Sequence, residues 1–253
     1  MRGILAACLL PLLSGCLGAH YGLDAARPLP PSGHPVGVVF IANGSGDFRG
    51  VSKNLSQVVA ETGAPLEIET CVWSHGYLRY LIDHIDHSNH REHGRLLAAR
   101  IAACRQACPD RRIYLVGHSA GCAVVLAAAE MLPPDSVDRI ILLAPSVCTT
   151  YDLRPALRTA RYGIDAFYSG RDFLILGFCV SVVGTADGRC RVAAGQCGFK
   201  PIISSPADAA LYGKLRQHPW DAAVEWSGHH GGHYGNNEPC FLRAYVLPLL
   251  MHE

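Results

Sequence analysis

The chain has 253 residues, of which 49% are hydrophobic, so it is long and apolar enough to bury one core of α/β size. Its 22 basic side chains nearly balance its 21 acidic ones, leaving a net charge of +1. This balance gives no electrostatic basis for binding nucleic acid or an anionic membrane surface, so neither is an expected partner on charge alone.

An apolar run at residues 4–13 follows Arg2 and leads into Leu-Ser-Gly-Cys, which ends at Cys16. The run is too short to span a bilayer but suits the apolar region of a secretory signal. Leu-Ser-Gly-Cys also resembles the bacterial lipobox, which implies a lipoprotein signal peptide at residues 1–15 and a lipid on Cys16. An ordinary signal peptide, or a buried helix with a chance cysteine, is the alternative. We therefore expect an exported protein anchored by lipid to a cell-envelope membrane, on its periplasmic or outer side.

Residues 16–35 are rich in Pro, Gly and Ala, which predicts an extended spacer before a domain at residues 36–253. The domain opens with an unbroken apolar strand, typical of the middle of a parallel sheet that is covered on both faces. A glycine loop and a helix follow. The first expected elements are a strand at 36–42, a loop at 43–47, a helix at 52–61, a strand at 66–73, a histidine-rich segment to His90 and a helix at 92–108.

The next stretch reads Arg-Ile-Tyr-Leu-Val-Gly-His-Ser-Ala-Gly at residues 112–121 and leads into an apolar run at 122–129. It predicts a short buried strand that turns sharply into a helix, with Ser119 on the turn. Glycines two positions before and after the serine let the backbone come close without a Cβ in the way. The serine hydroxyl would then project from the sheet edge at a helix N-terminus. The alternative is a strand-turn-helix with an incidental serine.

Strands and helices continue to alternate after this turn. The expected elements are a strand at 137–144, a helix at 153–160, a strand at 163–168, an irregular insertion at 173–218, a last strand at 222–226, a histidine-rich loop at 228–235 and a closing helix at 239–250. The alternation predicts an α/β fold: a mostly parallel sheet of about six strands flanked by helices on both faces.

A serine becomes nucleophilic only beside a base that is itself oriented by a carboxylate. Asp172 follows an expected strand at its C-terminal end, where sheets of this class collect functional groups. His233 lies in the loop after the last expected strand. The chain order Ser119, Asp172, His233 is the order expected for a serine on this kind of turn.

Alternatives remain for two of these positions. His229 and His230 share the loop of His233, which we favour because glycines nearby give that loop freedom. Asp187 is the alternative acid, although its surroundings read as a turn.

Three motifs, Gly-His-Ser-Ala-Gly, Ser-Gly-Arg-Asp after a late strand and Gly-Gly-His-Tyr-Gly, resemble the α/β-hydrolase fold family over residues 36–250. The resemblance implies a shortened fold without the family's first two strands. In this architecture the amide of the residue after the serine, Ala120, supplies one donor of the oxyanion hole. The second donor is expected in the loop after the first strand, at the amide of Ser45.

The expected function is that of a serine hydrolase that cleaves a carboxylic ester or related acyl bond through an acyl-enzyme, with no cofactor. A small-molecule or lipid-like acyl compound would be the substrate, and the oligomeric state stays open. An inactive hydrolase-fold binding or scaffold protein and a serine peptidase are the alternatives.

The chain has eleven cysteines, and nine remain when Cys8 and Cys16 are set aside, so they cannot all pair internally. Cys122 lies in the helix after Ser119 and is expected to be a buried apolar side chain. Two pairs are the candidate disulfides: Cys104 with Cys108, and Cys190 with Cys197.

Two histidine-rich stretches, at residues 83–90 and 229–233, contain metal-ligating side chains at short spacing. No cysteine pair or His-Glu helix motif accompanies them, so we expect no metal. His75, which follows a strand end, is a candidate wall residue of the substrate site.

Overall fold

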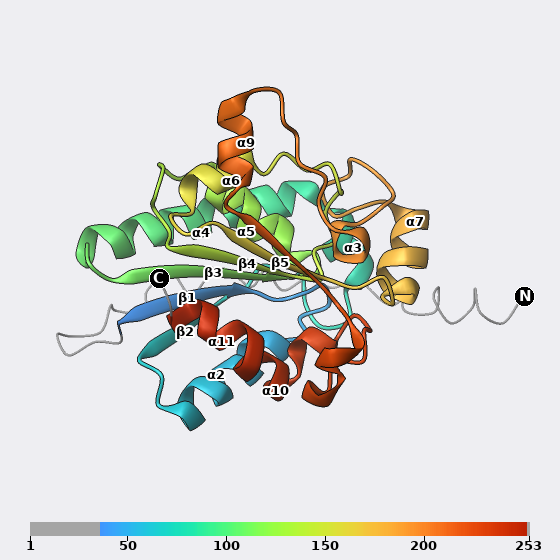
Figure 1. The fold of residues 1–253 in the computed structure, drawn as a ribbon, viewed down its shortest axis with the longest axis horizontal. Coiled ribbons are helices and arrows are strands. Elements are labelled where there is room, and N and C mark those ends of the chain that lie inside the picture. Colours follow the sequence, from blue (N-terminus) through green and yellow to red (C-terminus); the bar gives the residue numbers. More distant parts are fainter. Residues whose placement is uncertain (1–35, 252–253) are drawn as a thin grey trace, which may run out of the picture.

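The computed structural model describes residues 36–251, so the expected signal peptide, Cys16 and the spacer lie outside the described residues. Six parallel strands form one sheet in the order β2-β1-β3-β4-β5-β6 (Figure 1). The strands are β1 (Gly37–Ala42), β2 (Leu66–Cys71), β3 (Arg112–His118), β4 (Arg139–Leu143), β5 (Ile164–Tyr168) and β6 (Leu215–Pro219). The expected α/β sheet of about six strands is confirmed.

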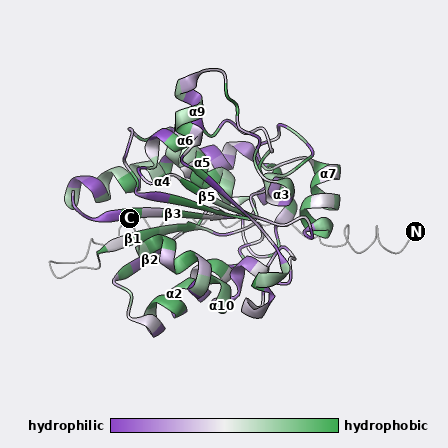
Figure 2. Cartoon of the chain, in the orientation of Figure 1, coloured by the Kyte–Doolittle hydropathy of each residue, from purple (hydrophilic) through white to green (hydrophobic). Residues whose placement is uncertain are grey.

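Helices cover both faces of the sheet (Figure 1). One layer contains α4 (His87–Ala107), α5 (Gly121–Glu130), α6 (Arg154–Thr159) and α9 (Pro206–Tyr212), and the other contains α2 (Gly50–Thr62), α10 (Pro239–Phe241), the π-helical η5 (Leu242–Val246) and α11 (Leu247–Met251). Each face has its own core, because alternate side chains of a strand point to opposite faces. Val38 and Phe40 of β1 pack toward α4 and α5, while Val39 and Ile41 pack toward α2. Figure 2 shows the resulting concentration of hydrophobic residues in the sheet.

Short helices complete the described chain. They are α3 (Tyr80–Ile85), the π-helical η2 (Phe173–Cys179), α7 (Val180–Val183), α8 (Ala194–Cys197) and the 3₁₀ turns η3 (Ala222–Ser227) and η4 (Gly235–Asn237). Helices α3 and α7 lie at the same end of the sheet (Figure 1). Within residues 36–251, no helix combines the length and the apolar character needed to cross a membrane.

The expected last strand at residues 222–226 is wrong. Those residues form η3, whose first turn is capped by the Asp221 side chain accepting from the Ala223 amide. The last strand is β6, which pairs only with β5 and is half-exposed along its length. An edge strand of this kind needs no apolar run, so hydrophobicity did not reveal it. The insertion therefore ends before β6, at residue 214, and contains the short helices η2, α7, α8 and α9.

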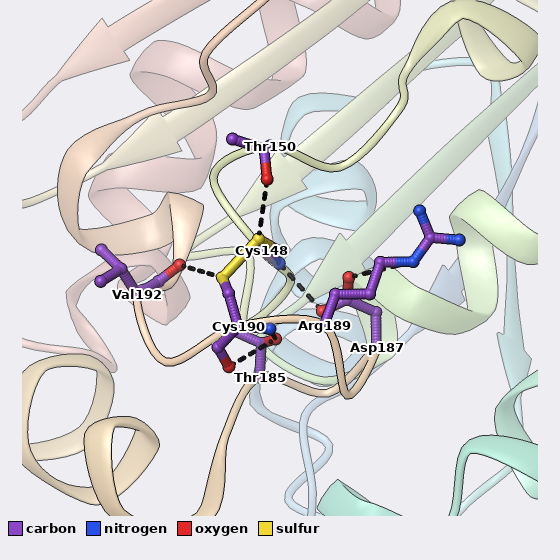
Figure 3. Close-up of a disulfide and its surroundings, with 7 residues drawn as sticks. All are labelled: Cys148, Thr150, Thr185, Asp187, Arg189, Cys190 and Val192. Carbon is purple, nitrogen blue, oxygen red and sulfur yellow. Dashed lines mark hydrogen bonds and ion pairs between the residues drawn. A yellow bond between two sulfur atoms is a disulfide. The ribbon is translucent and has the colours of Figure 1, made fainter.

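Both candidate disulfides are also wrong. The structure joins Cys148 to Cys190 across 42 residues, with Cα atoms 5.5 Å apart (Figure 3). Chain spacing did not reveal this pair, because a β-bridge between Cys148 and Ala193 brings the insertion beside the loop after β4. Cys122 is buried and free, as expected. Disulfides persist mainly in oxidising compartments, so this bond indicates an exported protein.

Candidate active site

The strand order changes direction between β1 and β3. Helix α2 follows β1 on one face of the sheet and α5 follows β3 on the other (Figure 1). Open α/β sheets bind ligands in the crevice outside the carboxyl ends of such a pair of strands. Ala42 at the end of β1 pairs with Gly117 of β3, so the loop after β1 lies beside the turn that carries Ser119.

Ser119 occupies the sharp turn between β3 and α5. Its φ angle is +53°, a left-handed conformation that is uncommon for a residue other than glycine. Neighbouring backbone holds it there: its amide donates to the carbonyl of Leu143 at 2.9 Å, and its carbonyl accepts from the amide of Ser146 at 3.2 Å. The turn is therefore fixed by the end of β4 and the residues just after it.

The two glycines of the turn are sterically required. A Cβ on Gly117 would lie 2.8 Å from the Cα of Cys122, and one on Gly121 would lie 2.3 Å from the carbonyl oxygens of Ala42 and Asn43. All of these are backbone atoms that cannot rotate away. The two glycines are therefore needed because the backbone packs too closely for a Cβ, as the sequence predicts.

The structure brings Ser119, His233 and Asp172 together. Ser119 Oγ lies 2.9 Å from His233 Nε2, and His233 Nδ1 lies 2.5 Å from Asp172 Oδ2. All three residues are buried. With its proton on Nδ1 donated to the carboxylate, the imidazole presents the Nε2 lone pair to the serine hydroxyl. The other oxygen of Asp172 caps η2 by accepting from the Leu176 amide at 3.3 Å.

The alternative acid and bases lie elsewhere. Burial lowers the pKa of His229 to about 4, and its Nδ1 accepts from the Gly231 amide at 3.1 Å. His230 is exposed. Asp187 accepts from the Cys148 amide at 3.0 Å beside the disulfide, where Figure 3 shows it. No hydrogen bond joins Asp187, His229 or His230 to Ser119, whose hydroxyl lies against His233.

His118, which sequence reasoning did not single out, joins the turn to the loop of the base. Burial lowers its pKa to about 3, so the ring is neutral. Its Nε2 lies 3.3 Å from the carbonyl oxygen of His233, to which it donates as a neutral imidazole. The position inside Gly-His-Ser-Ala-Gly was the available signal, but only the fold shows which way the ring points.

The loop that carries the expected second oxyanion donor lies next to the serine. A Cβ on Gly44 would be 3.3 Å from Ser119 Cβ, so the loop after β1 rests directly against the turn. In the described part of the chain, the amides of Ser45 and Ala120 donate to no protein acceptor. The Ser45 hydroxyl is buried and likewise has no partner among residues 36–251. Unpaired donors of this kind are available to a developing negative charge.

The histidine-rich segment before and within α4 binds the insertion. His84, His87 and His90 lie 2.9, 2.8 and 3.0 Å from the carbonyl oxygens of Gly184, Ala186 and Ala186. These side chains tie α3 and α4 to the loop after α7. Within the described residues, no group of three or more His, Cys, Asp or Glu side chains is arranged to hold a metal ion.

Aromatic and apolar side chains lie next to the base. The rings of Tyr77, Phe48 and Tyr234 form a strip with centroid distances of 5.5 and 6.4 Å, and Tyr234 directly follows His233. On the chain beyond Asp172, Phe173 and Leu174 are among the most exposed hydrophobic residues. Figure 2 shows hydrophobic turns at the neighbouring α7. Exposed apolar surface of this kind often marks a ligand or interaction site.

Comparison with known proteins agrees with this architecture. The sequence model of the alpha/beta hydrolase fold matches residues 73–173, which include the strand-turn-helix with Ser119 and end just past Asp172. Together with the six-stranded parallel sheet, this match gives the chain an α/β-hydrolase fold. No curated protein matches the sequence.

Several solved structures are similar over most of the chain. A Trichoderma reesei cutinase in complex with a phosphonate inhibitor is 16% identical, with a TM-score of 0.40, covering 87% of this chain and 78% of the cutinase. The catalytic core domain of acetyl xylan esterase from Trichoderma reesei is 14% identical, with a TM-score of 0.41, covering 83% and 98%. An extracellular α/β-hydrolase from a Paenibacillus species is 12% identical, with a TM-score of 0.44, covering 84% and 98%.

Proposed function

We propose that this protein is a serine hydrolase that cleaves carboxylic esters. The hydrogen-bonded series from Ser119 through His233 to Asp172 carries the proposal, since each member has the partner that its role requires. An α/β-hydrolase fold alone does not specify a reaction, and it is the geometry of these three side chains that supports hydrolysis.

In the proposed reaction, Ser119 Oγ attacks the ester carbonyl while its proton passes to His233 Nε2. Asp172 holds the imidazole in the required tautomer and stabilises the imidazolium that forms. The amides of Ala120 and Ser45 stabilise the oxyanion. Collapse of the tetrahedral intermediate expels the alcohol, which takes the proton from His233. Water then attacks the acyl-enzyme with His233 again as base, releasing the acid and regenerating Ser119.

We further infer that the substrate carries an apolar acyl group. The strip of Tyr77, Phe48 and Tyr234 lies next to the base and would bury such a group, worth about 0.8 kcal/mol for each CH₂ removed from water. A series of p-nitrophenyl esters of increasing acyl length tests this. Activity should rise from acetate to longer chains, and Tyr234→Ala should reduce this gain while leaving acetate hydrolysis within about threefold of the wild-type rate.

Labelling with a fluorophosphonate tests the nucleophile directly. Wild-type protein should be labelled on Ser119 and hydrolyse the ester series, whereas Ser119→Ala should do neither. Equal labelling of the two proteins, or hydrolysis by Ser119→Ala at the wild-type rate, would refute the proposal.

We also propose the layout of the remaining chain: a signal peptide at residues 1–15, a lipidated Cys16, a spacer at 16–35 and the hydrolase domain beyond. The Leu-Ser-Gly-Cys sequence and the disulfide support it. In bacteria fed a labelled fatty acid, the wild-type chain should carry the label and sediment with membranes. A Cys16→Ser chain that still carries the label would refute lipidation at this residue.

A further inference from the structure

The segment between β2 and α4 clamps the loop after β1. The Gly46 amide donates to Asp83 Oδ2 at 2.7 Å, and its carbonyl accepts from the Leu78 amide at 3.1 Å. On the other side of the loop, Trp73 Nε1 donates to the carbonyl of Asn43 at 2.8 Å. The loop that carries the expected oxyanion donor is therefore held by residues far from it in sequence.

Asp83 is the centre of this clamp. Its side chain is completely buried and accepts four hydrogen bonds, two at each oxygen. Oδ2 accepts from the Gly46 amide and from Ser74 Oγ at 2.5 Å, while Oδ1 accepts from the amide and the Nδ1 of His75 at 2.7 and 2.9 Å. The other ring nitrogen of His75 lies 3.3 Å from Asp86 Oδ2. Four donors compensate the lost hydration of a buried carboxylate and fix its position.

The anchored groups lie on either side of the Ser45 amide. Peptide units are planar, so a bond to one atom of a unit orients the whole unit. Trp73 holds the unit that joins Asn43 to Gly44, and Asp83 holds the unit that joins Ser45 to Gly46. The unit between them carries the Ser45 N–H. Glycine at position 44 would otherwise allow this middle unit to turn over easily.

We propose that Asp83 is a positioning residue for the oxyanion hole, which it keeps formed by aiming the Ser45 amide at Ser119. The inference rests on the proposed hydrolase function. Asp83 acts through Gly46 and touches no substrate atom. It matters most when negative charge develops on the carbonyl oxygen, so its loss should lower kcat and leave ground-state binding, and thus KM, nearly unchanged.

The substitution Asp83→Asn tests the proposal sharply. Whichever way the new amide turns, its NH₂ group faces either the Gly46 amide or the His75 amide, and a backbone N–H can only donate. In the first orientation the loop loses its bond to position 83. In the second it keeps that bond, but the side chain loses the His75 backbone donor that helps to fix its position. We expect kcat to fall roughly 10- to 100-fold, up to the effect of losing one oxyanion donor. KM should stay within about twofold, because contacts made equally in ground and transition states are kept.

A tetrahedral analogue separates this role from a merely structural one. A trifluoromethyl ketone adds Ser119 to form a tetrahedral oxyanion, so its affinity should fall by the same factor as kcat. Asp86→Asn is the matched control: it removes the same charge from another partner of His75, keeps an Asn able to cap α4 and makes no contact with the loop. It should behave as wild type.

Each outcome bears on a definite claim. If wild type is active and both Asp83→Asn and Trp73→Phe keep kcat and ketone affinity within twofold, or if KM rises as much as kcat falls, the positioning role is wrong while the hydrolase survives. If wild type is neither labelled nor active, the proposed function itself fails. Should Asp83→Asn not fold, Trp73→Phe decides, because it removes the bond to Asn43 and keeps a ring; unchanged kcat would overturn the proposal.

Discussion

Gly121 is the position where a single methyl group should disturb both the fold and the site. Its missing Cβ would lie 2.3 Å from two carbonyl oxygens, those of Ala42 and Asn43 at the end of β1. Unstrained contacts need about 3.5 Å, so Gly121→Ala must push the loop after β1 and the start of α5 apart by roughly 1 Å. That loop carries the Ser45 amide, and that helix begins directly after Ser119.

Two magnitudes follow from this displacement. Overpacking of a tight contact costs about 1–3 kcal/mol, so the free energy of unfolding should fall by about 2 kcal/mol. A misplacement of about 1 Å in a reacting geometry costs roughly 100-fold in rate. Domains are stable by about 5–15 kcal/mol, so Gly121→Ala stays almost fully folded and unfolding alone cannot explain such a loss.

The assay combines urea unfolding with kcat/KM for a p-nitrophenyl ester and with the rate of fluorophosphonate labelling. Gly232→Ala is the matched control, since it adds the same methyl group beside His233, where no atom beyond its two chain neighbours lies within 4 Å. It should leave kcat/KM unchanged. Gly121→Ala with wild-type stability and activity within threefold would refute the steric reasoning. An equal loss in both variants would show that the assay reports loop disturbance in general.

Three further results are expected from urea unfolding. The free energy of unfolding should fall by about 2 kcal/mol between pH 7 and pH 5 through His229 alone. Burial lowers the pKa of His229 in the folded protein to about 4, whereas its pKa in the unfolded chain is about 6.5, so the unfolded chain binds the extra proton as the pH falls. If His229→Phe has the same pH dependence of unfolding as the wild type, this account is wrong. Removing the disulfide with Cys148→Ser should cost about 4 kcal/mol for a loop of this length, whereas Cys197→Ser, at an exposed free thiol, should cost little. Asp165→Asn should cost about 3–5 kcal/mol, because it weakens a buried network in which Arg139 is almost fully enclosed; a loss below 1 kcal/mol would refute that account.

The central strands could be predicted from the sequence because both faces of the sheet are covered. Burial on both sides favours apolar runs, and such runs are found in β1, β3 and β4, whereas Asp165 interrupts the one in β5. The positions of Ser119 and Asp172 followed from the same logic, whereas His233 was placed after an expected strand at 222–226 that is a 3₁₀ helix, so its loop follows β6 through η3. Each lies just beyond a strand or in the loop that returns to the sheet edge, and parallel strands collect these loops at one end.

Features without a periodic or local signal could not be predicted. Strand β6 is a half-exposed edge, so the composition Leu-Arg-Gln-His-Pro carries no strand pattern. The disulfide joins two segments 42 residues apart that meet only because an isolated β-bridge aligns them. In both cases the deciding contact is long-range, and the sequence near the contact is compatible with several partners.

The stretch Asp83-His-Ile-Asp-His illustrates the same limit at the site itself. Its residue types suit metal ligation, but no cysteine pair or His-Glu helix motif accompanies them, so the sequence predicts no metal and assigns Asp83 no specific role. The fold gives its members different directions: Asp83 points inward to the amide of Gly46, while His84 and His87 reach carbonyl oxygens of the insertion. A carboxylate that accepts hydrogen bonds from backbone amides fixes a loop, whereas a carboxylate grouped with other ligand side chains can bind a metal ion. The direction in which each side chain points therefore determines its role here. That direction follows from tertiary packing, which the local sequence pattern does not encode.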